Sequence, residues 1–119
     1  MLPVDLAPLI KNVKKTYYYV DTDSYDEKTY YPKVFPLSLT EFDVHNVLVV
    51  EEDSTYAYYD DQDESLRCKS GVGSTSASTY WTRTVDKNSP SEDYFIQTDG
   101  DYKSDDPRDN RGYMAAFCI

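Results

Sequence analysis

The side chains of this sequence that could do chemistry are carboxylates, two cysteines and a single histidine. His45 has no Ser or Cys motif beside it, so a nucleophile activated by histidine is not indicated and we expect a partly exposed structural residue. Adjacent acids such as Asp60 and Asp61 stand in a polar run, where carboxylates are usually solvated. We therefore expect a protein that is not an enzyme.

The metal-binding patterns are incomplete. Asp21 and Asp23, followed by Asp26 and Glu27, supply oxygen ligands of the kind that Ca²⁺ prefers, but no glycine makes the sharp turn that a calcium loop needs. The calcium signatures of C-type lectins, Glu-Pro-Asn and Trp-Asn-Asp, do not occur either. We expect no metal and no cofactor.

Cys68 and Cys118 lie too far apart in the sequence to form a metal-spaced pair, so two reduced thiols are expected, with a disulfide as the alternative. No run of about 18 apolar residues indicates a membrane span. The first residues also lack the basic end and long apolar run of a signal peptide. A cytoplasmic location is expected by default.

Composition favours a folded binding protein over a nucleic-acid ligand. A chain of 119 residues fits one domain, predicted here as 1–119. The net charge of −10 argues against phosphate binding, which needs clustered Lys and Arg. The thirteen tyrosines combine apolar contact area with a polar hydroxyl, as adaptable binding surfaces do.

Residues 34–66 carry nine carboxylates and no Lys or Arg, interleaved with enough apolar residues to fold against something. Such a single-sign surface either directs the protein to a positively charged partner or serves solubility. The segment 51–64, in which acids and tyrosines alternate, is the candidate for partner binding. The candidate residues are Glu51, Glu52, Asp53, Tyr56, Tyr58, Tyr59, Asp60, Asp61, Asp63 and Glu64.

Residues 5–15 are predicted to form an amphipathic helix, because Leu6, Leu9, Ile10 and Val13 recur at helical spacing. Residues 17–20 are rich in strand formers and run into a turn-like cluster at 21–24. Residues 34–37 read as a short buried strand.

Ser38 and Glu41 have the spacing of a capping box, which predicts a helical turn around 39–43. Residues 47–50 fit a strand or a packed loop, and Asp53-Ser54-Thr55 is suited to cap a turn that bears the tyrosines of 56–59.

The charged and then Gly/Ser/Thr-rich stretch 60–79 is predicted to be a mobile or extended surface loop. Three strands are predicted after it, at 80–84, 94–96 and 113–119, with a hairpin turn at Asp99-Gly100. The predicted fold is therefore α+β: a small antiparallel sheet with one N-terminal amphipathic helix, short helical turns and long loops.

Four short segments, spread over nearly the whole chain, carry a family resemblance: 9–15, 33–41, 80–83 (Tyr-Trp-Thr-Arg) and 112–117. Together they resemble a bacterial and phage domain family of unknown function with a C-type-lectin-like fold, related to the formylglycine-generating-enzyme and phage variable-protein folds. The chain looks like the C-terminal half of such a domain, with Met114 in the place of the family's Arg and Ala115 in that of its Pro. The resemblance implies an order of strands rather than an activity.

Two functions follow as hypotheses. The first is an acidic binding protein that occupies the basic, nucleic-acid-binding surface of a partner. Its size and charge resemble those of the DNA-mimic nuclease inhibitors of phages and mobile elements, including inhibitors of CRISPR effectors. The alternative is a C-type-lectin-like module that recognises a receptor or ligand through loops between Trp81 and Gly112.

Overall fold

The computed structural model describes residues 7–21, 24–45, 51–70, 75–86, 91–108 and 111–118. These ranges contain two short 3₁₀ helices and eight strands. The helices are η1 (Ala7–Leu9) and η2 (Glu64–Arg67). The strands are β1 (Lys15–Asp21), β2 (Ser24–Tyr30), β3 (Lys69–Ser70), β4 (Ala77–Ser78), β5 (Tyr80–Val85), β6 (Asp93–Ile96), β7 (Tyr102–Asp105) and β8 (Gly112–Tyr113).

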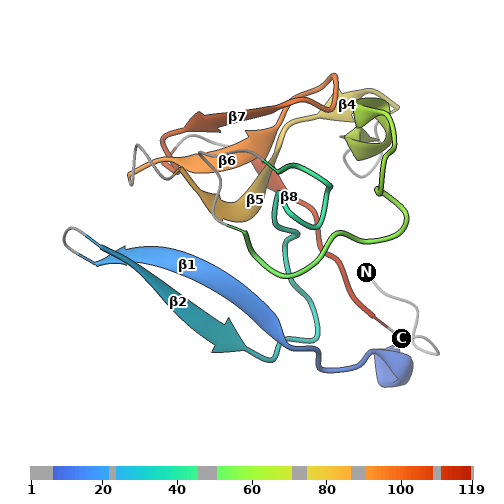
Figure 1. Cartoon of the computed structure of the whole chain (residues 1–119). Helices are drawn as coiled ribbons and strands as arrows, with labels where there is room; N and C mark the ends of the chain where they lie inside the picture. Colours follow the sequence, from blue (N-terminus) through green and yellow to red (C-terminus); the bar gives the residue numbers. More distant parts are fainter. Residues whose placement is uncertain are drawn as a thin grey trace.

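The strands form a four-stranded sheet, in the order β7-β6-β5-β8, and two separate hairpins, β1-β2 and β3-β4. Figure 1 shows the long β1-β2 hairpin running beneath the four-stranded sheet, with β1 nearer to β5. The pairs β5-β6 and β6-β7 are antiparallel, whereas β8 joins β5 in parallel. A parallel neighbour needs a long connection, and the chain makes it by passing through β6 and β7 before it returns as β8.

The β1-β2 hairpin follows from the run of tyrosines in β1. Tyr17 and Tyr19 project on the same face of the strand, because side chains alternate along a strand. Tyr17 packs edge-on against Tyr30 of β2, with ring centroids 5.2 Å apart. The register pairs Lys15 with Tyr30, so β1 presents its first side chain, Lys15, at the end of the hairpin that faces the rest of the fold.

The core lies between one face of the four-stranded sheet and the segment 35–44, which crosses it without regular secondary structure. The buried cluster consists of Phe35, Leu37, Leu39, Phe42, Val44, Tyr59, Tyr80, Tyr94 and Ile96. The opposite face of the sheet carries Trp81 and Phe95 in edge-to-face contact, and the Arg111 guanidinium lies 3.6 Å from the Phe95 ring centroid.

The end of the chain binds three segments in succession. After β8 leaves β5, Ala116 exchanges two backbone hydrogen bonds with Phe35, of 3.0 and 2.8 Å. The carbonyl of Cys118 then accepts from the Lys11 amide at 2.9 Å. The predicted strand at 113–119 is thus two residues of strand followed by isolated bridges, and Ile119 lies outside the described residues.

The α+β prediction is wrong: the described residues contain no N-terminal amphipathic helix, and most of their regular secondary structure is strand. In the described part of 5–15, residues 7–9 form η1 and the next residues are extended. Backbone pairing outweighs the helical pattern here: Lys11 bonds Cys118, and the Val13 amide donates to the Pro32 carbonyl at 3.0 Å. Leu9, which the helix would have buried, is 58% exposed.

Other expectations are confirmed. Strands occur at 17–20, 80–84 and 94–96, as predicted. The capping box is present: the Glu41 amide donates to Ser38 Oγ at 3.2 Å, and the Ser38 amide donates to Glu41 Oε1 at 2.9 Å. The loop predicted at 60–79 instead contains η2, β3 and β4. Residues 47–50 and part of the turn at 21–24 lie outside the described residues.

The β6-β7 hairpin turn depends on a glycine, and this can be tested. Gly100 has a φ of 91°, and a Cβ added there would lie 2.0 Å from the Glu64 carbonyl oxygen. Gly100→Ala is expected to lower the free energy of unfolding by at least ~2 kcal/mol, measured by urea denaturation. The control is Gly112→Ala, whose Cβ would make an ordinary 3.6 Å contact with the Thr79 carbonyl oxygen. Equal losses in the two variants would contradict this account.

Candidate functional site

A group of charges joins β1, the segment 35–44, residues 52–53 and β5; we call it the ionic centre. It is made of Lys15, Glu41, Glu52, Asp53 and Arg83, of which Asp53 is the exposed member. Its middle is the Glu41 carboxylate, which is fully buried. The Lys15 ammonium pairs with Glu41 Oε2, and the Arg83 guanidinium pairs with Glu41 Oε1. One carboxylate therefore holds two cations from two different strands.

Arg83 also serves three other groups. Its Nε donates to the Thr16 carbonyl at 3.0 Å, Nη1 to the Pro36 carbonyl at 2.8 Å, and Nη2 to Asp53 Oδ2 at 2.6 Å. The side chain is 5% exposed. A guanidinium can donate to several acceptors at once because its five N–H groups are fixed in a plane, whereas the ammonium group of a lysine is a single compact charge.

The carboxylates of Glu52 and Asp53 occupy the edge of β1 that does not face β2. The Tyr18 amide donates to Glu52 Oε2 and the Thr16 amide to Asp53 Oδ2, both at 2.8 Å. The Thr84 hydroxyl of β5 donates to Glu52 Oε1 at 2.7 Å. Glu52 and Asp53 therefore bridge the hairpin to the main sheet.

Burial raises the pKa of Glu52 to about 7, against the opposing effects of its hydrogen bonds from Thr84 and Tyr18 and of the Arg83 charge. Glu41 adds to the rise through like-charge repulsion. Glu52 is consequently the carboxylate of the ionic centre that titrates near neutrality.

His45 lies between two acids on the surface. Its Nδ1 is 2.9 Å from Glu51 Oε1, and its Nε2 is 3.1 Å from Asp43 Oδ1 and 3.0 Å from Thr55 Oγ1. The hydrogen bond with Glu51 raises the pKa of His45, with a further rise from Asp43, although desolvation opposes it. The prediction of a partly exposed histidine agrees with this placement.

The ten candidate partner-binding residues divide into an inner and an outer set. Glu52 and Asp53 belong to the ionic centre, the Tyr56 hydroxyl accepts from the Lys15 ammonium at 2.6 Å, and the Tyr59 ring packs on Phe42 in the core. The outer set consists of Glu51, Tyr58, Asp60, Asp61, Asp63 and Glu64, all exposed.

Four acids of the outer set follow one another closely on a surface segment; we call Asp60, Asp61, Asp63 and Glu64 the acidic turn. Its backbone is held in place: the Asp61 amide donates to Asp43 Oδ2 at 2.8 Å, and Asp63 caps η2 by accepting from the Ser65 amide at 2.9 Å. Asp61 has a φ of 52°, a left-handed conformation that Asp tolerates better than most residues.

The capping hydrogen bond from the Ser65 amide holds the pKa of Asp63 below its ordinary value. Together with the Asp61–Asp43 hydrogen bond, this makes the acidic turn an ordered surface segment rather than a loose acidic loop.

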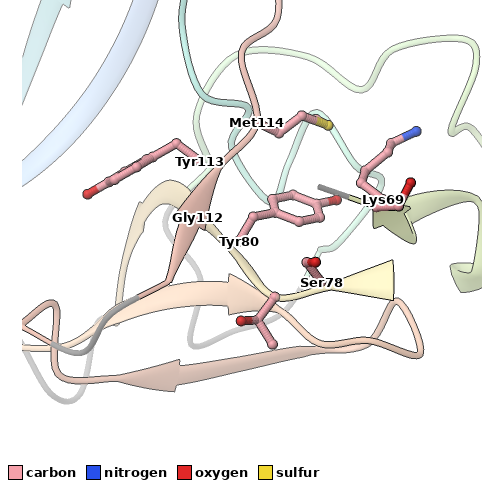
Figure 2. A pocket seen from close by; sticks show the side chains of 8 residues that line it. Lys69, Ser78, Tyr80, Gly112, Tyr113 and Met114 are labelled. Atoms are coloured by element: carbon pink, nitrogen blue, oxygen red, sulfur yellow. The ribbon is translucent and has the colours of Figure 1, made fainter. Parts of the chain in front are cut away.

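Sequence reasoning missed Lys15, which the helix prediction had placed on an exposed helix end. Nothing in the sequence pairs Lys15 with Glu41, 26 positions away. It also missed the hollows beside the end of the chain. One of them, of about 120 Å³, is lined by residues that include Lys69, Tyr80, Gly112 and Met114. Figure 2 shows that the Tyr113 ring points away from the side chains of Tyr80 and Met114.

Within the described ranges, no group of three or more His, Cys, Asp or Glu side chains is arranged to hold a metal ion. The same residues form no helix with the length and apolarity that a membrane crossing needs.

The fold and the site define a small β-sheet domain with a charged interior and an acidic surface segment. The model of a family described as a domain of unknown function, DUF6273, matches residues 3–119, so the chain belongs to this family. No curated protein and no solved structure matches the chain.

The ionic centre predicts the effect of removing its guanidinium. Arg83→Met removes one of the two cations that pair with the buried Glu41 carboxylate, and it also removes the cation that pairs with Asp53. The free energy of unfolding is therefore expected to fall by about 3–5 kcal/mol. The matched control is Arg108→Met, since the Arg108 side chain is 89% exposed and pairs with Asp106, two positions away. Urea denaturation of both variants checks this, and a loss below ~1 kcal/mol for Arg83→Met would rule out the role given to the ionic centre.

Stability is expected to decline as pH rises from about 4.5 to about 7. The folded state raises the pKa of Glu52 to about 7, so it binds this proton more tightly than the unfolded chain does. The stabilisation from this proton is complete below the ordinary pKa of a glutamate and is lost as the pH rises through the raised pKa of Glu52. The free energy of unfolding falls by about 2–3 kcal/mol over this range. The raised pKa of His45 acts in the same direction above the ordinary histidine pKa of 6.5.

Urea denaturation between pH 4.5 and 8.5 measures this decline. In Glu52→Gln most of the decline should disappear, whatever the variant's absolute stability. The same slope in both proteins would show that Glu52 does not titrate in this range.

Proposed function

We propose that this protein is a non-enzymatic acidic binding protein that occupies a basic, nucleic-acid-binding surface of a partner protein, in the manner of a DNA-mimic inhibitor of a defence nuclease. The observation that carries the proposal is the acidic turn. Its four carboxylates are exposed, whereas Glu41, Glu52 and Asp53 form ion pairs and hydrogen bonds within the ionic centre.

The geometry of the acidic turn suits the recognition of arginine and lysine. The Asp61 amide donates to Asp43 and the Asp63 carboxylate accepts from the Ser65 amide of η2. These hydrogen bonds fix the backbone in advance, so little conformational entropy is lost on binding. Carboxylates in fixed positions form strong charge-assisted hydrogen bonds with guanidinium groups, as phosphates do. The net charge of −10 would speed the encounter with a basic surface and suppress binding to acidic ones.

The proposal predicts the behaviour of a charge-reversed variant. Asp60→Lys combined with Glu64→Lys should lose the partner, because both residues are exposed and neither belongs to the ionic centre. The control is Asp26→Lys with Glu27→Lys, which makes the same change in charge at exposed positions of β2.

The measurement is capture of partners from a bacterial lysate on the immobilised protein, at about 0.05 and 0.5 M salt, followed by elution with duplex DNA. The proposal expects basic nucleic-acid-binding proteins that salt and DNA release, and that only the variant in the acidic turn fails to capture. A partner that the Asp60→Lys, Glu64→Lys variant retains at both salt concentrations would overturn the proposal.

A further inference from the structure

A second hollow, of about 420 Å³, opens beside the acidic turn. Its lining includes the buried side chains of Phe35, Leu37 and Tyr59, together with Ala57, Phe117 and Cys118. The volume lies within the range of roughly 300–1,000 Å³ that is usual for ligand pockets, which are mostly apolar. The hollow therefore has room for a large side chain of a partner.

The hollow and the acidic turn are parts of one structure. The Asp60 amide donates to the carbonyl of Ala57 at 3.4 Å, so the backbone that forms one wall continues directly into the acids. Tyr58, 61% exposed, stands at the rim and packs edge-on against Tyr59 at 4.9 Å. The Lys69 ammonium lies 5.9 Å from both of these ring centroids, so the chain's own cation lies beside the two rings.

Charge complementarity decides what such a place binds. The adjacent carboxylates repel acidic ligands, and a second copy of this chain also carries a charge of −10. A peptide segment that combines an apolar side chain with neighbouring Lys and Arg satisfies both the hollow and the acids. The apolar residue loses contact with water, and the basic residues pair with the exposed carboxylates of the acidic turn, which follows Tyr59 in the chain.

We propose that this hollow, the anchor pocket, takes one apolar side chain of a Lys/Arg-rich segment of the partner, while the acidic turn binds the basic residues on either side of it. The inference rests on the proposed function and adds a specific anchoring contact to it. A protein that recognised its partner by charge alone would bind any basic segment equally well.

Two fluorescein-labelled peptides test the anchor: Gly-Lys-Arg-Trp-Arg-Lys-Gly and the same sequence with Gly in place of Trp. Fluorescence anisotropy is expected to show at least ~10-fold tighter binding of the Trp peptide, because burying an aromatic side chain has an effect of this size. The ratio should persist as salt rises, although both affinities fall. Equal affinities for the two peptides would overturn the anchor pocket.

A bulky substitution in the lining of the anchor pocket tests whether the Trp side chain of the peptide binds there. Ala57→Trp should remove the advantage of the Trp peptide, whereas Ser54→Trp, at an exposed position outside the pocket lining, should keep it. A second measurement does not require a filled pocket. In a Cys68→Ser background the Trp peptide should slow the alkylation of Cys118 by iodoacetamide, and the Gly peptide should not. An unchanged alkylation rate at a saturating concentration of the Trp peptide would overturn the location.

The failure of this inference can be told apart from that of the proposed function. Suppose that Asp60→Lys combined with Glu64→Lys lowers the affinity for both peptides, and that the wild-type protein binds the two peptides equally well. The role of the acidic turn is then supported, and the anchor pocket is ruled out. If the charge reversals leave the affinity for both peptides unchanged, the proposed function is ruled out, whether or not the Trp peptide binds more tightly than the Gly peptide.

Discussion

The arrangement of this protein depends on one fully buried carboxylate, that of Glu41, held between the Lys15 ammonium and the Arg83 guanidinium. Removing these charges from water is costly, and their mutual attraction offsets the cost only when every remaining donor and acceptor is also satisfied. The neighbouring backbone meets this condition, since the Ser38 amide and the carbonyls of Thr16 and Pro36 complete the hydrogen bonds. The position of the β1-β2 hairpin relative to the main sheet is thereby specified by charge, whereas the sheet itself is specified by apolar packing.

Acids in this protein have two physically different roles, although they are neighbours in the sequence. Glu52 and Asp53 both accept hydrogen bonds from the edge of β1. Glu52 is buried, and Asp53 pairs with the Arg83 guanidinium. Only a few residues later, Asp60 and Asp61 are solvated and have no basic partner among the ion pairs described. The change from one role to the other coincides with the tyrosines of 56–59, which bring the chain from the ionic centre across the core to the surface.

Local features of the fold could be predicted from the sequence, and long-range ones could not. The capping box of Ser38 and Glu41 and the turn at Gly100 were predictable because all their atoms lie within a few residues. The periodicity of 5–15 predicted a helix that does not form, because its backbone pairs with Cys118 and Pro32. Charge alone could not separate the inner from the outer acids, because burial of Glu52 depends on Tyr18 and Thr84, more than thirty positions away on either side.

The carboxylates along β1 have a further consequence for self-association. An uncovered strand edge is a template on which another chain can add a strand, and this is a common start of aggregation. In this protein the outward amides of Thr16 and Tyr18 are already bound by Asp53 and Glu52, so this part of the β1 edge is closed to a second molecule by side chains rather than by a neighbouring strand.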